Sequence, residues 1–320
     1  MADIAAGKCR ILAPAQPGAD PADLHRPDSS SMNDAAHDLA GLPEPLTHES
    51  PAEDDYHRRF GGVARLYGAA GLARLEAASV CVVGIGGVGS WAAEALARNA
   101  VGCITLIDLD HIALSNTNRQ IHALGDAYGR AKVEAMAERI VAINPRCQVT
   151  QVDDFVTPDN VPELLGAGYD YVIDAIDAVR VKTGMLGWAR RQGVPVITCG
   201  GAGGQLDPTR VRIDDLARTI QDPLLSKVRA GLRKQWGFTR DPKKKFGIAA
   251  VYSDEPLQYP EPEQQACEID EAPPLDGQPG QPAMRGPQGL ACAGFGSSVA
   301  VTAVFGFVAA SAVIGEIARG

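Results

Sequence analysis

The stretch SVCVVGIGGVGSWAAEALA, residues 79–97, decides the fold of this chain. A short apolar run typical of a buried strand leads into a glycine-rich turn, and an alanine- and leucine-rich helical pattern follows. Gly84, Gly86 and Gly89 form the pattern G-x-G-x-x-G, with Gly87 between them. This order of elements predicts a backbone loop that approaches nucleotide phosphates at a helix N-terminus. The loop alone does not distinguish a dinucleotide such as NAD from another phosphate ligand.

Strand-like and helical segments alternate along the chain after this loop. The alternation predicts an α/β protein with a Rossmann-like, doubly wound and mostly parallel sheet. We expect strands at 79–83, 103–108, 148–155, 169–176, 194–201, 204–213 and 247–253. We expect helices at 90–100, 129–144, 179–192 and 222–236, and a final apolar helix at 294–318.

Composition divides the chain into three parts. Residues 1–52 are rich in Ala, Pro, Asp, Ser and Gly and lack periodicity, so we expect a disordered extension, with Met32 as an alternative start of translation. Residues 53–215 are expected to form the nucleotide-binding domain. Residues 216–320 are expected to form a smaller C-terminal extension, which includes an acidic, proline-rich loop at 254–289.

The bulk composition is ordinary for a soluble globular protein. The 320 residues are 45% hydrophobic and 22% charged with a net charge of −9, so no overall basic character indicates a DNA partner. Seven cysteines without a C-x-x-C pair predict a reduced chain without structural zinc. No secretory signal opens the chain, so a cytoplasmic location is expected. The apolar stretch 297–318 is long enough to span a bilayer, but a buried core helix is the favoured interpretation.

Charged residues downstream of the glycine turn indicate which nucleotide binds. Asp108 follows the second strand, where a carboxylate can accept hydrogen bonds from ribose hydroxyls, and Asp110 is the alternative. Asn116 and Arg119 come next, and Lys132 lies thirteen residues further on. Attack on the α-phosphorus of a triphosphate builds charge on the leaving pyrophosphate, which such cations stabilise. Together they favour ATP over NAD, although each cation alone is also typical of a solvated helix surface.

Two carboxylates, Asp174 and Asp177, lie at the end of the fourth strand. Ligands in open α/β sheets bind beyond the carboxyl ends of the strands, and a carboxylate there can hold Mg²⁺ together with phosphate oxygens. Asp177 is the expected Mg²⁺ ligand because it lies further out, and Asp174 is expected to cap or support the next helix. Cys199, near the same edge, is expected to be structural.

The combined motifs G-x-G-G-V-G, D-x-D, S-N-x-x-R-Q, a downstream lysine and D-x-x-D resemble the adenylating domain of ubiquitin-activating-type enzymes over residues 56–215. The resemblance implies an ATP site in which Asp108 binds ribose and Asp177 holds Mg²⁺. The remaining implied nucleotide contacts come from Gly84, Gly86, Gly87, Gly89, Asp110, Asn116, Arg119 and Lys132.

Further segments are similar to the tRNA threonylcarbamoyladenosine dehydratase family, among them RRFGGVARLYG at 58–68, CGGAGGQLDPT at 199–209 and GFGSSVAVTAVFGFVA at 294–309. That family uses ATP to cyclise the threonylcarbamoyl group on adenosine 37 of tRNA. The resemblance implies a tRNA substrate and a homodimer, and it leaves open a sulfur-acceptor or desulfurase partner. It also implies an arginine that reaches the partner subunit's phosphates, for which Arg59 is favoured over Arg65.

Two other functions remain as alternatives. An activator of a ubiquitin-like or sulfur-carrier protein would share the adenylation motifs, but such enzymes usually carry two C-x-x-C pairs and often a catalytic cysteine in the crossover region, both of which this sequence lacks. An NAD-dependent oxidoreductase would share only the glycine loop.

A basic segment supports an RNA substrate. Residues 227–245 contain eight Lys or Arg and one Asp within an acidic chain. Such cations bind a phosphodiester backbone by releasing counterions, and Trp236 and Phe238 could stack on an unpaired base. A solvated surface helix with Trp236 in the core is the alternative. The predicted RNA-binding residues are Lys227, Arg229, Arg233, Lys234, Lys243, Lys244 and Lys245.

Overall fold

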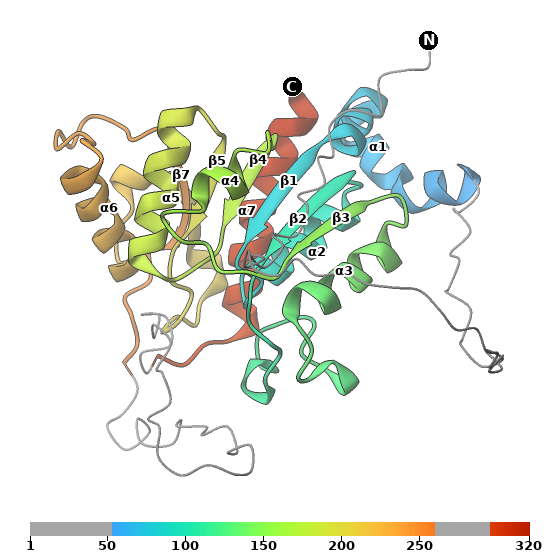
Figure 1. Cartoon of the computed structure of the whole chain (residues 1–320), viewed down its shortest axis with the longest axis horizontal. Coiled ribbons are helices and arrows are strands. Elements are labelled where there is room, and N and C mark those ends of the chain that lie inside the picture. Colours follow the sequence, from blue (N-terminus) through green and yellow to red (C-terminus); the bar gives the residue numbers. More distant parts are fainter. Residues whose placement is uncertain (1–52, 260–294) are drawn as a thin grey trace, which may run out of the picture.

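The computed structural model describes residues 53–259 and 295–320, which form one seven-stranded sheet covered by helices (Figure 1). The strand order is β3-β2-β1-β4-β5-β7-β6, with β6 antiparallel to β7 and every other pair parallel. This confirms the predicted doubly wound, mostly parallel α/β fold. The strands are β1 (Ser79–Val83), β2 (Cys103–Ile107), β3 (Gln148–Val152), β4 (Tyr171–Asp174), β5 (Val196–Cys199), β6 (Val211–Asp215) and β7 (Ala249–Ser253).

Helices cover both faces of the sheet. They are α1 (Glu53–Ala77), α2 (Gly89–Arg98), α3 (Lys132–Ile143), α4 (Val161–Leu165), α5 (Val179–Gln192), α6 (Pro223–Gln235) and α7 (Val299–Arg319). Along β1, Val80 and Val82 pack into the core beneath α2, α3 and α7, whereas Cys81 and Val83 pack into the core beneath α4, α5 and α6. Because side chains alternate across a strand, an unbroken apolar strand buries both of its faces in this way.

The C-terminal residues are part of the same sheet and core. β7 lies between β5 and β6, so the predicted domain boundary at residue 215 falls between two paired strands of one sheet. α7, red in Figure 1, runs along the sheet and packs against α1 and α2. A Cβ at Gly306 would lie 2.4 Å from the carbonyl oxygen of Val88, which shows how closely α7 approaches the start of α2.

α7 has the length and composition of a membrane span, and no other described helix does. Its most apolar 18-residue window is 56% buried within the protein. Val301, Phe305 and Val313 are fully buried against the sheet and the neighbouring helices. These contacts are those of a core helix, as favoured from the sequence.

Several predicted boundaries are wrong. The strand expected at 204–213 begins only at Val211, because Asp207 caps a 3₁₀ turn by accepting a hydrogen bond from the Thr209 N–H at 2.9 Å. The final helix begins at Val299 rather than at residue 294, because Ser298 provides its N-cap. The strands expected at 148–155, 169–176 and 194–201 are each shorter. The predicted extension 1–52 and most of the predicted loop 254–289 lie outside the described residues.

Candidate adenylation site

The glycine turn joins β1 to α2 through two positions that only glycine suits. Gly84 has a φ of +87°, and its N–H donates to the carbonyl oxygen of Ile107 at 2.9 Å. A Cβ at Gly89 would lie 1.7 Å from the carbonyl oxygen of Gly84. The turn therefore lies directly on the first turn of α2, where helix N–H groups and the positive end of the helix dipole favour phosphate.

An acidic and basic cluster at the end of β2 adjoins this turn. Asp108 Oδ2 accepts a hydrogen bond from the Ile85 N–H at 2.6 Å, which ties the ends of β2 and β1 together. Lys132 Nζ lies 2.6 Å from Asp110 Oδ2 and 3.8 Å from Asp108 Oδ1. Burial raises the pKa of Asp108, and the positive charge of Lys132 opposes that rise. The structure thus brings together the predicted ribose acid, its alternative and the predicted phosphate lysine.

Arg119 reaches the same turn from the loop after β2. Its Cγ would lie 3.1 Å from a Cβ at Gly87, so the arginine stem crosses the open face of that glycine. The Nη1 atom donates to the Ser115 carbonyl and to Asn118 Oδ1, both at 2.8 Å. Arg119 forms no ion pair with any described carboxylate, so its charge is available to an anion. Buried Asn116 accepts the Ala113 N–H at 3.0 Å and shapes this loop.

A buried pair, Gln120 and His122, lies beside these residues and was not among the predicted site residues. His122 Nε2 lies 3.1 Å from Gln120 Oε1, and Gln120 Nε2 faces Gly86 at 4.0 Å from where its Cβ would be. Burial, helped by Lys132 and Arg139, lowers the pKa of His122 to about 4, so the ring is neutral at neutral pH. No sequence signal distinguished this histidine from a solvated loop residue.

The end of β4 carries both predicted aspartates in different roles. Asp174 is completely buried, with Oδ2 at 2.7 Å from Lys182 Nζ and 2.6 Å from Thr198 Oγ1. Lys182 Nζ also donates to the Ile176 carbonyl at 2.9 Å, which fixes the turn that leads to Asp177. Asp177 is half-buried and makes no hydrogen bond or ion pair within the described ranges. Asp174 therefore supports α5 through Lys182, a lysine that the sequence analysis missed, and Asp177 is the available carboxylate.

The glycine turn, the charged cluster after β2 and the end of β4 all lie at the carboxyl edge of the sheet. The Cβ of Ala175, at the end of β4, lies 3.3 Å from where a Cβ at Gly89 would be, so the β4 exit touches the glycine turn. The glycine turn, Asp108 and the cations Arg119 and Lys132 lie together, and the chain runs from Ala175 beside them to the available carboxylate of Asp177; groups of these kinds suit a nucleoside triphosphate. The model of the ThiF family matches residues 56–315. The chain belongs to the ThiF family.

Within the ThiF family, the chain is similar to several proteins of one name. The chain is 52% identical over 259 residues to the tRNA threonylcarbamoyladenosine dehydratase of Escherichia coli, which covers 81% of this chain and 92% of that one. It is 47% identical over 267 residues to the enzyme of the same name from Haemophilus influenzae, and the match covers 83% of this chain and 95% of that one. A crystal structure of the E. coli dehydratase in complex with ATP matches at a TM-score of 0.71 and 50% identity, covering 82% of this chain and 95% of that one.

Two predicted residues of this ThiF-family chain lie apart from the turn. Arg59 is exposed on α1, and its Nη1 donates to the carbonyls of Ala142 and Ile143 at 3.1 and 3.0 Å, at the end of α3. Arg65, its alternative, is exposed on the same helix. Cys199 is buried, and burial raises its pKa to about 12, so it is an unreactive thiol in the core.

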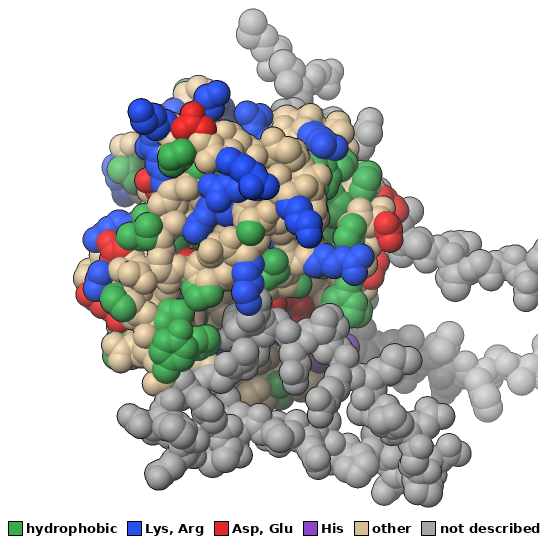
Figure 2. Space-filling model, turned by 90° about the vertical axis from the view of Figure 1, so that its left-hand side faces the viewer, with side chains coloured by type: hydrophobic (Ala, Val, Ile, Leu, Met, Phe, Trp, Pro, Cys, Tyr) green, Lys and Arg blue, Asp and Glu red, His purple; other side chains and the backbone are tan. Residues whose placement is uncertain are grey.

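The predicted RNA-binding residues lie on another face, around α6. Figure 2 looks onto this side, where Lys and Arg side chains gather. Exposed members are Lys227, Lys234 and Lys243, Lys244 and Lys245, while Arg229 and Arg233 are half-buried. Trp236 is half-buried: a Cβ at Gly187 would lie 2.2 Å from its ring, and Arg191 lies over the ring at 4.6 Å. Phe238 packs edge-on against Phe246 at 4.9 Å.

Proposed function

We propose that this chain catalyses the ATP-dependent cyclisation of N6-threonylcarbamoyladenosine at position 37 of tRNA, through adenylation of the threonyl carboxylate. The observation that carries the proposal is that Asp108, Lys132 and Arg119 lie at the glycine turn, which also touches Ala175 on the way from β4 to Asp177, together with 52% identity to a named dehydratase. A dinucleotide site needs neither the two cations nor the available carboxylate, so the same geometry disfavours an oxidoreductase.

Each element has a binding role in this reaction. The turn from Gly84 to Gly89 and the start of α2 hold the phosphates, and Asp108 accepts the ribose hydroxyls. Arg119 offers a bidentate guanidinium, and Lys132 offers a point charge to the leaving pyrophosphate. Because these groups are held in place before ATP arrives, they stabilise the charge that develops without further reorganisation.

Two displacements complete the chemistry. An oxygen of the threonyl carboxylate attacks the α-phosphorus of ATP, the bond from that phosphorus to the pyrophosphate oxygen breaks, and an acyl-adenylate forms. An atom of the ureido group then attacks the activated carbonyl, loses its proton, and AMP leaves with the former carboxylate oxygen. The net change in the nucleoside is the loss of one water. Positioning supplies most of the acceleration, so no cysteine nucleophile is required.

The residues present fit a magnesium ion bound together with ATP. Asp177 is an oxygen ligand without a competing partner in the described ranges, and Mg²⁺ is commonly held by one or two carboxylates and substrate phosphates. No group of three or more His, Cys, Asp or Glu side chains that could hold a metal converges in the part of the chain that the structure describes. Bound there, Mg²⁺ would neutralise charge on the phosphates.

The basic residues around α6 would bind the tRNA backbone, and the charge and exposure of these residues support this role.

The chain would act in the cytoplasm as a homodimer. Arg59 lies on the α1 surface, from which a side chain could reach the partner subunit's phosphates. From the family resemblance we also expect a sulfur-acceptor or desulfurase partner.

ATP–pyrophosphate exchange tests the proposal. We expect the purified chain to exchange labelled pyrophosphate into ATP only with tRNA that carries threonylcarbamoyladenosine. Asp177→Asn should lower the exchange rate at least about a hundredfold, because the neutral amide no longer offers a negatively charged ligand to the phosphate-bound cation. Glu163→Gln, an exposed carboxylate of α4, is the matched control and should change nothing. Exchange stimulated instead by a carrier protein's Gly-Gly tail would favour an activator of that carrier.

A further inference from the structure

A groove at the carboxyl edge of the sheet has no role in the function proposed so far. It measures about 470 Å³ and lies between the start of α6 and the segment that follows β7. Gln221, Ser226 and Arg229 line one wall, and Pro256, Leu257 and Tyr259 line the other. Asp222, at the base of α6, accepts the Gly201 N–H at 3.0 Å just beyond β5. The groove therefore opens at the same carboxyl edge of the sheet as the glycine turn.

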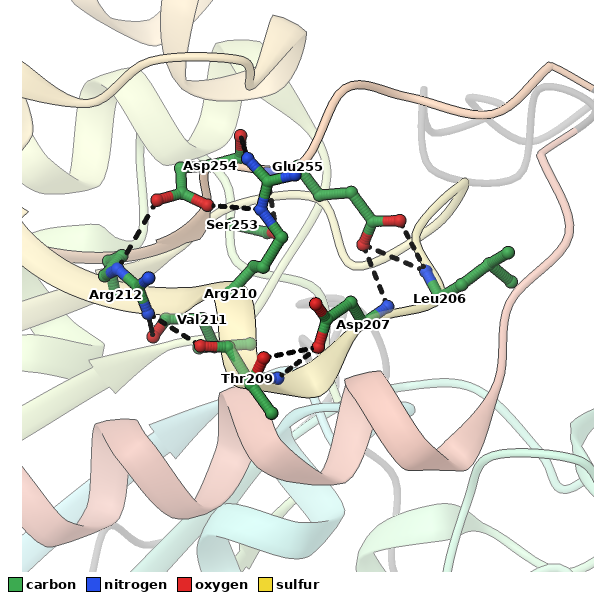
Figure 3. Close-up of polar contacts among 9 residues, drawn as sticks. All are labelled: Leu206, Asp207, Thr209, Arg210, Val211, Arg212, Ser253, Asp254 and Glu255. Carbon is green, nitrogen blue, oxygen red and sulfur yellow. Dashed lines mark hydrogen bonds and ion pairs between the residues drawn. The ribbon is translucent and has the colours of Figure 1, made fainter.

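The second wall is held rigidly by the contacts drawn in Figure 3. Buried Glu255 accepts the N–H groups of Leu206 and Asp207 at 3.1 and 2.9 Å. Asp254 pairs with Arg210 at 2.7 Å, and the Gln258 N–H donates to the Gly204 carbonyl at 2.8 Å. These bonds fasten residues 254–258 to the segment after β5, so Pro256 and Leu257 form a fixed apolar surface.

Arg229 places an available cation in this groove. It is half-buried and donates to the Thr219 hydroxyl, but it forms no ion pair with a described carboxylate. Asp222, which carries the nearby negative charge, already accepts the Leu225 and Gly201 N–H groups. Burial and the adjacent Arg233 lower the pKa of Arg229, and the negative charge of Asp222 opposes this shift. A half-buried cation of this kind is suited to a phosphate or carboxylate.

An exposed aromatic ring faces the same groove from the opposite wall. The Tyr259 side chain is 73% exposed, and its ring lies 5.1 Å from that of Phe295 in a tilted arrangement. Unpaired bases of RNA commonly stack on exposed aromatic rings. A cation next to such a ring can bind the phosphate of the stacked nucleotide.

The backbone at Gln221 is strained at the mouth of this groove. Its φ is +55°, and Gln221 and Ala100 are the two residues other than glycine in the described ranges with a positive φ. Such a conformation is energetically unfavourable and clusters at ligand clamps and active sites. Here it holds an exposed polar side chain at the groove entrance.

We propose that this groove holds an unpaired nucleotide of the tRNA next to the modified adenosine, with its base on Tyr259 and its phosphate at Arg229. Arg229 lines the groove, and Arg233 lies one helical turn further along α6, on the side of the molecule where Lys and Arg side chains gather in Figure 2. A tRNA bound to that face would extend past the groove towards the ATP site. This inference rests on the proposed function and names where its substrate is held.

The test separates tRNA binding from ATP binding in the full-length chain. Tyr259→Ala should raise the Kd for modified tRNA about tenfold or more, because base stacking on an aromatic ring is lost. The KM for ATP should stay unchanged, and Tyr259→Phe, which keeps the ring, should restore tRNA binding. Arg229→Gln should weaken tRNA binding and reduce its salt dependence.

Gln221→Gly should affect stability and tRNA binding in opposite directions. Glycine removes the strain of the positive φ, so the urea midpoint should stay equal or rise, but tRNA binding should weaken. Ala100→Gly relieves the same kind of strain far from the groove and is the matched control, with unchanged tRNA affinity. If wild-type chain cyclises modified tRNA but Tyr259→Ala and Arg229→Gln bind it normally, the groove proposal is overturned alone. Wild-type chain that neither binds nor cyclises modified tRNA overturns the proposed function and this inference together.

Discussion

Replacing Lys182 with methionine lowers the free energy of unfolding by about 3–5 kcal/mol in our account, because the change leaves the buried Asp174 carboxylate without its charge partner. Both side chains are fully buried, and their charged atoms are 2.7 Å apart. Burial raises the pKa of Asp174, and Lys182 counteracts this rise, so removing the lysine drives the carboxyl towards its neutral form. Urea unfolding at neutral pH measures the loss.

A double variant separates stability from positioning. Asp174→Leu combined with Lys182→Met removes both buried charges and should recover much of the lost stability, since apolar pairs often replace buried ion pairs at little cost. It should still show reduced turnover, because Lys182 no longer holds the Ile176 carbonyl before Asp177. A Lys182→Met protein within about 1 kcal/mol of wild type would contradict a structural role for the pair.

Gly89→Ala is the second large effect. A Cβ there would lie 1.7 Å from the Gly84 carbonyl oxygen and 3.3 Å from the Ala175 Cβ, so the turn must move away from α2. We expect a loss of about 3 kcal/mol in unfolding free energy, at the upper end for overpacking, and loss of measurable ATP binding. Chemical unfolding and calorimetric titration with ATP measure the two effects.

Gly86→Ala is the matched control for that variant. Its Cβ would meet only Gln120 Nε2, at 4.0 Å, and Gly86 has no positive φ, so the fold should be kept. ATP affinity should nevertheless fall, because the methyl group occupies the surface that phosphates approach. Equal unfolding free energies for Gly86→Ala and Gly89→Ala would show that Gly89 is not a packing position.

The sheet and the centre of the site could be predicted because local sequence determines them. An apolar strand followed by a glycine turn and a helix places Gly84 and Gly89 at the carboxyl edge, and the end of the next strand places Asp108 beside them. In a parallel sheet all strand ends lie at one edge, so Asp177 could also be assigned to it. These inferences need only the order of the elements.

Other features depend on packing that no local pattern reveals. Lys182 lies between Val181 and Thr183 in a helix, and only the folded chain shows that it is buried opposite Asp174. Only the folded chain shows that the ring of Trp236 packs against Gly187. α1 was not predicted, because its four glycines lower helix propensity and its stability comes from packing against α7 and neighbouring elements.

Mass spectrometry of tRNA nucleosides shows whether this chain removes water from threonylcarbamoyladenosine. Full-length chain is incubated with ATP, Mg²⁺ and tRNA that carries threonylcarbamoyladenosine, and the tRNA is digested to nucleosides. We predict that the threonylcarbamoyladenosine signal is replaced by a species lighter by one water, with one AMP formed for each nucleoside converted, and that omission of ATP abolishes the change. An unchanged nucleoside in the presence of ATP, from a chain that binds ATP normally, would contradict the account.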